Sequence, residues 1–472
     1  MQPDNVVQKI WSLCNILRGD GITYYQYISE LSYLLFLKFA QENGSERLLP
    51  EGYRWIDLVE HETDGLLGFY QEMLTHLGVA AESEAVRAIY AFPTTVFSHS
   101  ENLSAVIRGI ASIEWHEIGE DKFGEIYSGL IAKSQDARSG AGQYFTPRPL
   151  IGVLVKLTKP KLGNVIQDPA VGSGGFLVAA DNFVRTSNSN DSYEKNPPLY
   201  QGAEIEKNTR RICLMNSFLH DLKAEIIFGD ALTDDASPFS PPDLILANPP
   251  FGAKAGSQRV LRSDIRHPQS NKQLAFLQHI YGSLKQGGRA AVVLPDSVLF
   301  EDGIGKQVRQ EMMEQCNLHT ILRLPNGIFS GAGVKTNVLF FGKPKRKQKI
   351  TKSIWFYDLR TNMPSFGKTN VLGSKHFCEF VQLFGDDALA GTGRVEGPED
   401  GRWRQLSREQ VADRGDNLDW IWLQDESSNP SDQRSSPDEI AAAIREQLSA
   451  ALLDIEAIGN ELGMSDVNEV AK

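Results

Sequence analysis

Cysteine is scarce in this chain of 472 residues, and its four cysteines are widely scattered. Cys14, Cys213, Cys316 and Cys378 do not have the spacing of a zinc knuckle or of a disulfide framework. The pattern predicts reduced thiols in the core of a cytoplasmic protein and no metal site.

Long apolar runs are also missing. The best candidate for a membrane span, Leu31–Phe39, is interrupted by Ser32 and Lys38 and falls short of the roughly 18 residues that a bilayer requires. The first four residues lack the basic and then apolar pattern of a secretion signal. We therefore expect a cytoplasmic protein with no membrane partner.

An excess of positive charge is the third absence, because the formal net charge is −12. A protein that binds DNA on its own usually carries a basic surface, so this balance argues against a stand-alone DNA binder. Half of the excess lies after residue 430, where nine acidic residues accompany three basic ones. The rest of the chain is closer to neutral.

Three regions are predicted along the chain. Residues 1–135 are expected to form an all-α domain, because Tyr24–Glu42 and later stretches are rich in Leu, Tyr and Phe and lack helix breakers. A polar, Gly-rich segment, 134–142, follows as a linker. Residues 136–400 are expected to form the second domain, and residues 401–472 a helical tail.

Short β-rich runs alternate with helical runs between residues 143 and 360, which predicts a doubly wound, Rossmann-like α/β sheet. The expected strands cover residues 165–167, 200–205, 224–228, 243–247, 290–294, 320–324, 337–341 and 354–358. Only Gly342–Ser353 separates the last two strands, so the sequence predicts a hairpin between them and at least one antiparallel strand.

The tail carries one clear helix signal. Ser436–Glu439 has the pattern of a helix N-cap, and apolar residues from Ile440 to Leu462 then fall on one stripe. This predicts an amphipathic docking helix, which packs either on a partner or on the core of this chain.

A glycine-rich segment at a strand-to-helix turn marks the first candidate site. It runs from Asp168 to Phe176 and includes Pro169, Gly172, Ser173 and Gly174. Such turns at the carboxyl ends of strands form the ligand crevice of a doubly wound sheet. The segment has neither the Gly-Lys-Ser/Thr ending of a phosphate-binding loop nor the Gly-x-Gly-x-x-Gly spacing, which favours a nucleoside ligand without a pyrophosphate.

Acidic residues end the next two expected strands. Glu204 can accept hydrogen bonds from both hydroxyls of a ribose, and Asp230 can accept one from an adenine amino group. Their positions make an incidental glycine-rich turn a much weaker interpretation of residues 168–174.

A second segment, Asn248-Pro249-Pro250-Phe251, directly follows an expected strand. An amino group conjugated with a base ring is a poor nucleophile, and the Asn248 side-chain oxygen and the Pro249 carbonyl can accept its two N–H groups. Consecutive prolines restrict the backbone and help to aim that carbonyl. Phe251 can stack on a base that has swung out of the double helix.

These two segments together resemble the cofactor and catalytic motifs of the amino-methyltransferases. Their order is similar to the γ class, and residues 142–147 resemble the segment that contacts the methionine part of the cofactor there. The candidate residues of that segment are Gln143, Tyr144, Phe145 and Thr146. The helical N-terminal region and Thr336–Phe341 make the chain similar to the modification subunits of type I restriction-modification systems over most of residues 1–425.

The resemblance implies S-adenosylmethionine as cofactor and methyl transfer to the N6 amino group of adenine in double-stranded DNA. It also implies a specificity subunit that reads the DNA, with two copies of this chain for each specificity chain, and an optional nuclease-translocase subunit. Alternatives remain: N4 methylation of cytosine, methylation of a protein glutamine, or an inactive scaffold subunit. No cysteine follows a proline, which disfavours C5 methylation of cytosine.

Two basic clusters are left over. The first follows the catalytic segment, where it is expected either to close over the flipped base or to be a solvated loop, and comprises Lys254, Arg259, Arg262, Arg266 and His267. The second, residues 343–352, crowds the predicted hairpin, and a solvated surface is the favoured interpretation there.

Overall fold

The computed structural model describes residues 3–18, 21–115, 123–136, 146–236, 238–251, 260–268, 271–329, 334–345, 351–366, 370–390 and 393–424. The chain divides into two compact units, Met1–Trp422 and Leu423–Lys472, and all described helices and strands belong to the first. The predicted docking helix of the tail lies outside the described residues. Among the described helices, none combines the length and apolar composition that crossing a lipid bilayer requires.

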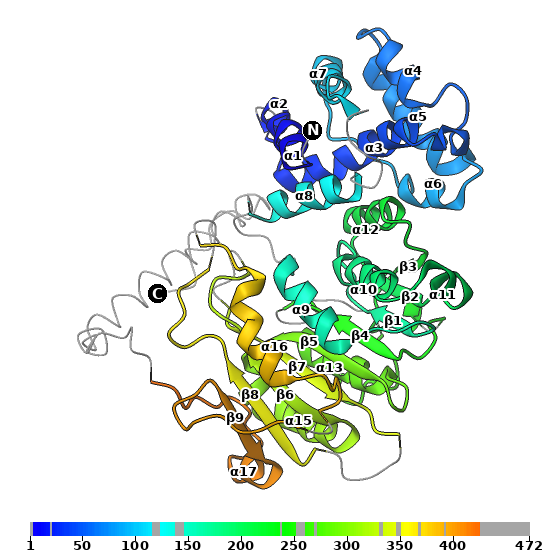
Figure 1. Cartoon of the computed structure of the whole chain (residues 1–472). Helices are drawn as coiled ribbons and strands as arrows, with labels where there is room; N and C mark the ends of the chain where they lie inside the picture. Colours follow the sequence, from blue (N-terminus) through cyan, green and yellow to red (C-terminus); the bar gives the residue numbers. More distant parts are fainter. Residues whose placement is uncertain are drawn as a thin grey trace, which may run out of the picture. The chain divides into compact units, whose positions relative to one another are not determined.

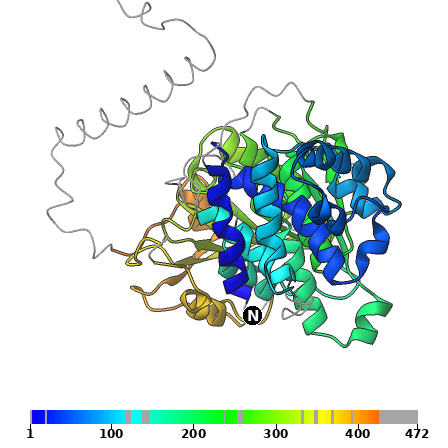
Figure 2. The same ribbon diagram turned by 90° about the horizontal axis from the view of Figure 1, so that it is seen from above.

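The N-terminal region is helical, as predicted, and its helices group together (blue to cyan in Figure 2). Its elements are α1 Pro3–Ser12, α2 Cys14–Arg18, α3 Tyr24–Glu42, η1 Ser45–Leu48, α4 Trp55–Glu60, α5 Leu66–Ala80, α6 Glu84–Ile89, α7 Ser100–Ala111 and α8 Phe123–Asp136. The longest of them, α3, begins at a capping box in which Thr23 and Gln26 bond each other's backbone amides. Its buried Leu, Tyr and Phe side chains belong to a hydrophobic core that the N-terminal helices largely form.

A nine-stranded sheet makes up the rest of the fold (Figure 1). Its strands are β1 Val165–Asp168, β2 Leu199–Glu204, β3 Ala224–Phe228, β4 Leu244–Ala247, β5 Arg289–Pro295, β6 Asn317–Arg323, β7 Thr336–Gly342, β8 Ser353–Asp358 and β9 Trp403–Ser407, in the order β3-β2-β1-β4-β5-β7-β6-β8-β9. The neighbouring strands β3, β2, β1, β4 and β5 are all parallel to one another. β7 is antiparallel to both of its neighbours.

Helices cover both faces of this sheet. They are α9 Arg148–Thr158, α10 Gly175–Thr186, α11 Asn190–Lys195, α12 Lys207–Leu219, η4 Asp234–Ala236, α13 Lys272–Ser283, α14 Ser297–Phe300, α15 Ile304–Gln315, η5 Ser374–Phe377, α16 Cys378–Phe384 and α17 Arg408–Asp413. Leu244 and Leu246 of β4 point toward the core under α9, α10 and α16, and Ile245 and Ala247 toward the core under α13 and α15. Alternate residues of one strand thus pack into two different cores. Because both faces of the strand are buried, its sequence is a continuous apolar run.

The predicted hairpin between β7 and β8 is wrong, although the predicted antiparallel strand is present. β7 pairs with β5 and β6, and β8 pairs with β6 and β9, so β6 separates the two strands. All seven residues of β7 are buried, as is typical of a strand in the interior of a sheet with both faces covered. A connection of about ten residues can reach some 33 Å, far more than the roughly 10 Å needed to pass one strand.

The sequence also missed β9, because the run Trp403–Ser407 is short and alternates weakly. It pairs antiparallel with β8, and the Trp403 ring stacks on Trp355 with centroids 5.0 Å apart. Residues 403–413 therefore pack with the sheet, although the sequence had assigned them to the tail. Cys378 differs from its prediction too, since it is exposed while the other three cysteines are buried.

A buried ion pair holds together the strand ends beside the candidate site. The Arg360 guanidinium, after β8, contacts both carboxylate oxygens of Asp296, after β5, at 2.7 and 2.8 Å. It also donates to the carbonyls of Leu324, after β6, and Thr336, at the start of β7. One cation thus connects four strands where the ends of β5, β6 and β8 meet the start of β7. Burial raises the pKa of Asp296, but the Arg360 cation opposes this effect, and the pKa lies below its usual value.

We expect Arg360→Leu to lower the free energy of unfolding by about 2–3 kcal/mol, because the largely buried Asp296 loses its cation. Urea denaturation measures this loss. The double variant with Asp296→Leu should be more stable than Arg360→Leu alone. The exposed pair Lys195–Asp191 is the matched control, and Lys195→Leu should cost less than about 1 kcal/mol. Equal losses of stability at the two ion pairs would contradict the proposed structural role of the Arg360–Asp296 pair.

Candidate active site

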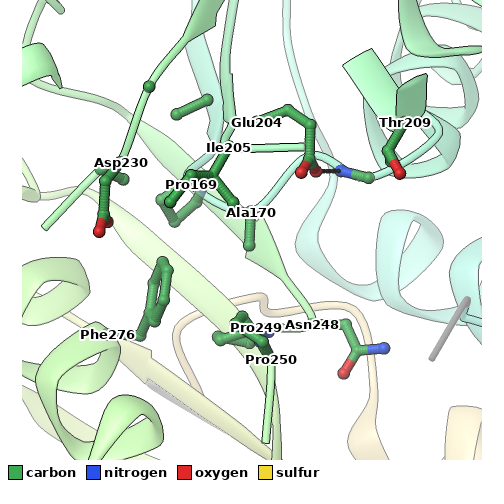
Figure 3. A pocket seen from close by; sticks show the side chains of 14 residues that line it. Pro169, Ala170, Glu204, Ile205, Thr209, Asp230, Asn248, Pro249, Pro250 and Phe276 are labelled. Atoms are coloured by element: carbon green, nitrogen blue, oxygen red, sulfur yellow. Dashed lines mark hydrogen bonds between the residues drawn. The ribbon is translucent and has the colours of Figure 1, made fainter. Parts of the chain in front are cut away.

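The carboxyl ends of β1, β2, β3 and β4 surround one pocket (Figure 3). Its empty volume is about 740 Å³, which includes space open to solvent. The lining residues are Pro169, Ala170, Gly172, Ala203, Glu204, Ile205, Thr209, Gly229, Asp230, Ala231, Asn248, Pro249, Pro250 and Phe276. Three residues of the glycine-rich segment and three of the four residues Asn248–Phe251 therefore meet at a single site.

The glycine-rich turn is tied to the end of β2. The Gly172 amide donates to a carboxylate oxygen of Glu204 at 3.1 Å, and the Glu206 amide donates to the other oxygen at 2.8 Å (Figure 3 draws the bond to Gly172). Gly172 and Gly174 have φ angles of 55° and 81°, in the left-handed region that favours glycine. Gly174 is also the N-cap of α10.

Asp168 lies behind this turn and does not line the pocket. It is 2% exposed, and its carboxylate accepts a hydrogen bond from the Ala170 amide at 3.0 Å. Burial raises the pKa of Asp168 to about 8, against the lowering effect of that bond. Burial likewise raises the pKa of Glu204 to about 7, although the Glu206 and Gly172 amides lower it.

Asp230 stands at the end of β3, on the opposite side of the pocket from Thr209 (Figure 3). One of its carboxylate oxygens accepts from the Leu232 amide at 3.0 Å, which fixes the direction of the side chain. The pocket thus has carboxylates at the ends of two neighbouring strands, and Ile205 and Phe276 add apolar surface to its lining.

Asn248, Pro249 and Pro250 form the part of the lining contributed by the end of β4. The amide nitrogen of Asn248 donates to the Thr146 hydroxyl at 3.1 Å, which ties the Asn248 side chain to the segment before α9. Thr146 is the described member of the predicted segment 143–146, and Gln143, Tyr144 and Phe145 lie outside the described residues.

Phe251 does not line the pocket. It is half-buried, and its ring meets Phe329 edge to face, with centroids 6.2 Å apart and an interplanar angle of 83°. Ser173 is not a lining residue either, but its carbonyl accepts a hydrogen bond from the Asn216 side chain at 3.0 Å. Within the described ranges, no three His, Cys, Asp or Glu side chains gather closely enough to hold a metal ion.

Several lining residues escaped the sequence analysis. Ile205 directly follows Glu204, and Thr209 lies in the first turn of α12, so their positions beside a strand end were a usable signal. Phe276 carried no such signal, because it lies within α13 and reaches the pocket only through the packing of that helix on the sheet.

The described members of the first basic cluster are engaged by acidic neighbours. Arg262 pairs with Asp264 at 2.6 Å, and His267 and Arg266 approach Glu311 at 3.1 and 3.8 Å. Lys343, of the second cluster, donates to the carbonyls of Tyr281 and Gly282. These contacts favour a structural surface role for the four residues concerned, whereas Lys254, Arg259 and residues 346–350 of the two clusters lie outside the described residues.

Two family models match the chain: the N-6 DNA methylase model over residues 118–424 and the HsdM N-terminal domain model over residues 6–110. The methylase subunit of the type I restriction enzyme EcoKI, from Escherichia coli strain K12, is 40% identical and aligns with 99% of this chain and 97% of its own length. The StySPI methylase subunit of Salmonella potsdam has the same identity and coverage. The crystal structure of the EcoKI M protein covers 99% of this chain and 98% of its own, at 37% identity and a TM-score of 0.58.

The two raised pKa values predict how the stability of the ligand-free chain varies with pH. A carboxyl group with a higher pKa in the folded protein stabilises it most fully below about pH 4, and this contribution is lost as the pH rises through about 7 for Glu204 and 8 for Asp168. Asp168→Asn should therefore stabilise the ligand-free protein above about pH 8, and the gain should shrink toward acid pH. Thermal denaturation across this range measures it; a gain that is constant with pH would contradict the assignment.

Proposed function

Because the chain belongs to the N-6 DNA methylase family, among the methylase subunits of type I restriction enzymes, we propose that Asn248–Phe251 forms its catalytic site and that residues 168–174, Glu204 and Asp230 hold its cofactor. The chain is an adenine-specific DNA methyltransferase that uses S-adenosylmethionine and acts as a modification subunit. One observation carries the assignment of the site: the segment after β4 and the acidic strand ends line the same pocket.

The residues of the pocket fit S-adenosylmethionine. Glu204 and Asp230 supply acceptors for ribose hydroxyls and an adenine amino group, and Ile205 and Phe276 supply apolar surface for the purine ring. The bound cofactor contributes a methyl group activated by a positively charged sulfur. We assign the methionine end of the cofactor to the segment 143–146.

Asn248 and Pro249 are proposed to raise the nucleophilicity of the target amine. The Asn248 side-chain oxygen and the Pro249 carbonyl accept its two N–H groups, which favours a pyramidal nitrogen with a lone pair available for bonding. These acceptors act in a partly enclosed pocket, where oriented dipoles stabilise developing charge most effectively. The hydrogen bond between the Asn248 amide and Thr146 keeps the acceptor oriented before substrate arrives.

Phe251 and Phe329 are proposed to hold the extruded base. The two rings come from different segments and already contact each other next to the end of β4. An adenine that has left the DNA stack loses stacking energy, and an aromatic face restores part of it. Phe329 was not identified from the sequence, because it lies in a loop between β6 and β7.

A specificity subunit is proposed to read the DNA sequence, with two copies of this chain for each specificity chain and an optional nuclease-translocase subunit. The net charge of −12 and the engaged basic side chains support this division. We also propose that the complex works in the cytoplasm. Membership of the N-6 DNA methylase family and the well-formed pocket weigh against cytosine, protein and scaffold alternatives.

Asn248→Ala should lower the rate of methyl transfer to DNA by about 100-fold or more, because one of two transition-state acceptors is lost. Calorimetry should show S-adenosylmethionine binding close to that of the wild type. The exposed Asn190 offers a matched control, and Asn190→Ala should be fully active. Full activity of Asn248→Ala in the assembled complex would refute the catalytic assignment.

The proposed stoichiometry has its own test. Native mass spectrometry of this chain co-expressed with its specificity subunit should give a dominant species of two copies to one. A uniform one-to-one complex that methylates both DNA strands would contradict the proposal, whatever the result for Asn248.

A further inference from the structure

Helix α12 belongs to two hydrophobic cores at once. Its Ile212 and Met215 side chains are buried in the core of the N-terminal helices, whereas Cys213 is buried in the core beneath α9 and α10. The helix follows the end of β2 closely, and the side chain of Glu206, its N-cap, accepts hydrogen bonds from the amides of its first turn. It therefore connects the helical region with the part of the sheet that forms the pocket.

One side of α12 is anchored in the helical region by Arg211. This side chain is 3% exposed, and its guanidinium lies over the Tyr33 ring, 3.9 Å from the ring centroid. It also donates to the Ser29 carbonyl at 3.4 Å. The neighbouring carboxylate of Glu30 is fully buried and accepts hydrogen bonds from Tyr70, Thr95 and Val96. A displacement of the helical region would therefore move α12 with it.

The other side of α12 contacts the glycine-rich turn. A Cβ atom added at Gly174 would come within 3.0 Å of the Cys213 sulfur, so the helix packs directly against the turn. Asn216, which is 3% exposed, donates from its side-chain nitrogen to the Ser173 carbonyl at 3.0 Å. The turn is thus held by Glu204 at Gly172 and by Asn216 at Ser173.

The orientation of the Asn216 amide follows from its two partners. The Ser173 carbonyl can only accept a hydrogen bond, so the amide nitrogen must face it. The amide oxygen then faces Ser128 of α8, whose hydroxyl donates to it at 3.2 Å. A single side chain in α12 thus joins the helical region to the turn.

We propose that Asn216 is a positioning residue for the cofactor turn, and that through Ser128 it makes cofactor affinity depend on the placement of the N-terminal helical region. The inference rests on the proposed cofactor site. A turn held in its binding conformation loses less conformational freedom when the ligand binds, so releasing the tether at Ser173 weakens binding. Asn216 lies outside the lining of the pocket, so it acts through the backbone of residues 172–174.

Asn216→Asp tests the hydrogen bond with almost no change in shape, because an acceptor replaces the donor that faces the Ser173 carbonyl. We expect the dissociation constant for S-adenosylmethionine, measured by calorimetry on the full chain, to rise roughly tenfold. In methylation assays with the specificity subunit, KM for the cofactor should rise while kcat at saturating cofactor changes little. Asn190→Asp, on the exposed first turn of α11, controls for the added charge and should bind as the wild type does.

A double-mutant cycle tests the link to the helical region. Ser128→Ala should weaken cofactor binding by a smaller factor than Asn216→Asp, and it should have no further effect in an Asn216→Ala background. Wild-type affinity in a folded Asn216→Asp protein would overturn the inference, as would an effect of Ser128→Ala that persists without Asn216. If the wild-type chain itself failed to bind the cofactor, the proposed cofactor site would fail instead.

Discussion

The hydrogen bond between the Gly172 amide and the Glu204 carboxylate is the contact on which the site depends. It fixes the turn after β1 against the end of β2, and the same carboxylate is available to a ligand in the pocket. Burial raises the pKa of this group and of Asp168 behind it, so the ligand-free site carries an electrostatic cost. Hydrogen bonds that a ligand donates to the Glu204 carboxylate offset the part of that cost that Glu204 carries.

Strand order explains how distant segments reach one site. The consecutive neighbours β3, β2, β1 and β4 are parallel, so their carboxyl ends share one edge of the sheet. A residue that directly follows any of these strands therefore faces the same crevice. This is why Glu204, Asp230 and Asn248 were recognisable from the sequence, since each required only a correct strand end and not a tertiary contact.

The features that escaped the sequence depend on tertiary packing. Phe276 reaches the pocket through the rotation of α13 on the sheet, and Asn216 reaches Ser173 through the position of α12. The predicted pairing of β7 with β8 was wrong because a short connection shows only that two strands are close in the sequence. It does not show that they are hydrogen-bonded neighbours in the sheet. β9 was missed because its partner, β8, decides its conformation more than its own composition does.

The charge distribution bears on how chemistry and DNA reading are divided. A protein that reads bases needs unpaired basic groups for the phosphates, but Arg262, Arg266 and His267 already face carboxylates. In the proposed division of labour a separate subunit reads the base sequence, so that signal reaches the pocket through protein contacts, in addition to the extruded base itself. Helix α12 touches both the helical region and the turn at Ser173, which makes it a direct physical route for such coupling.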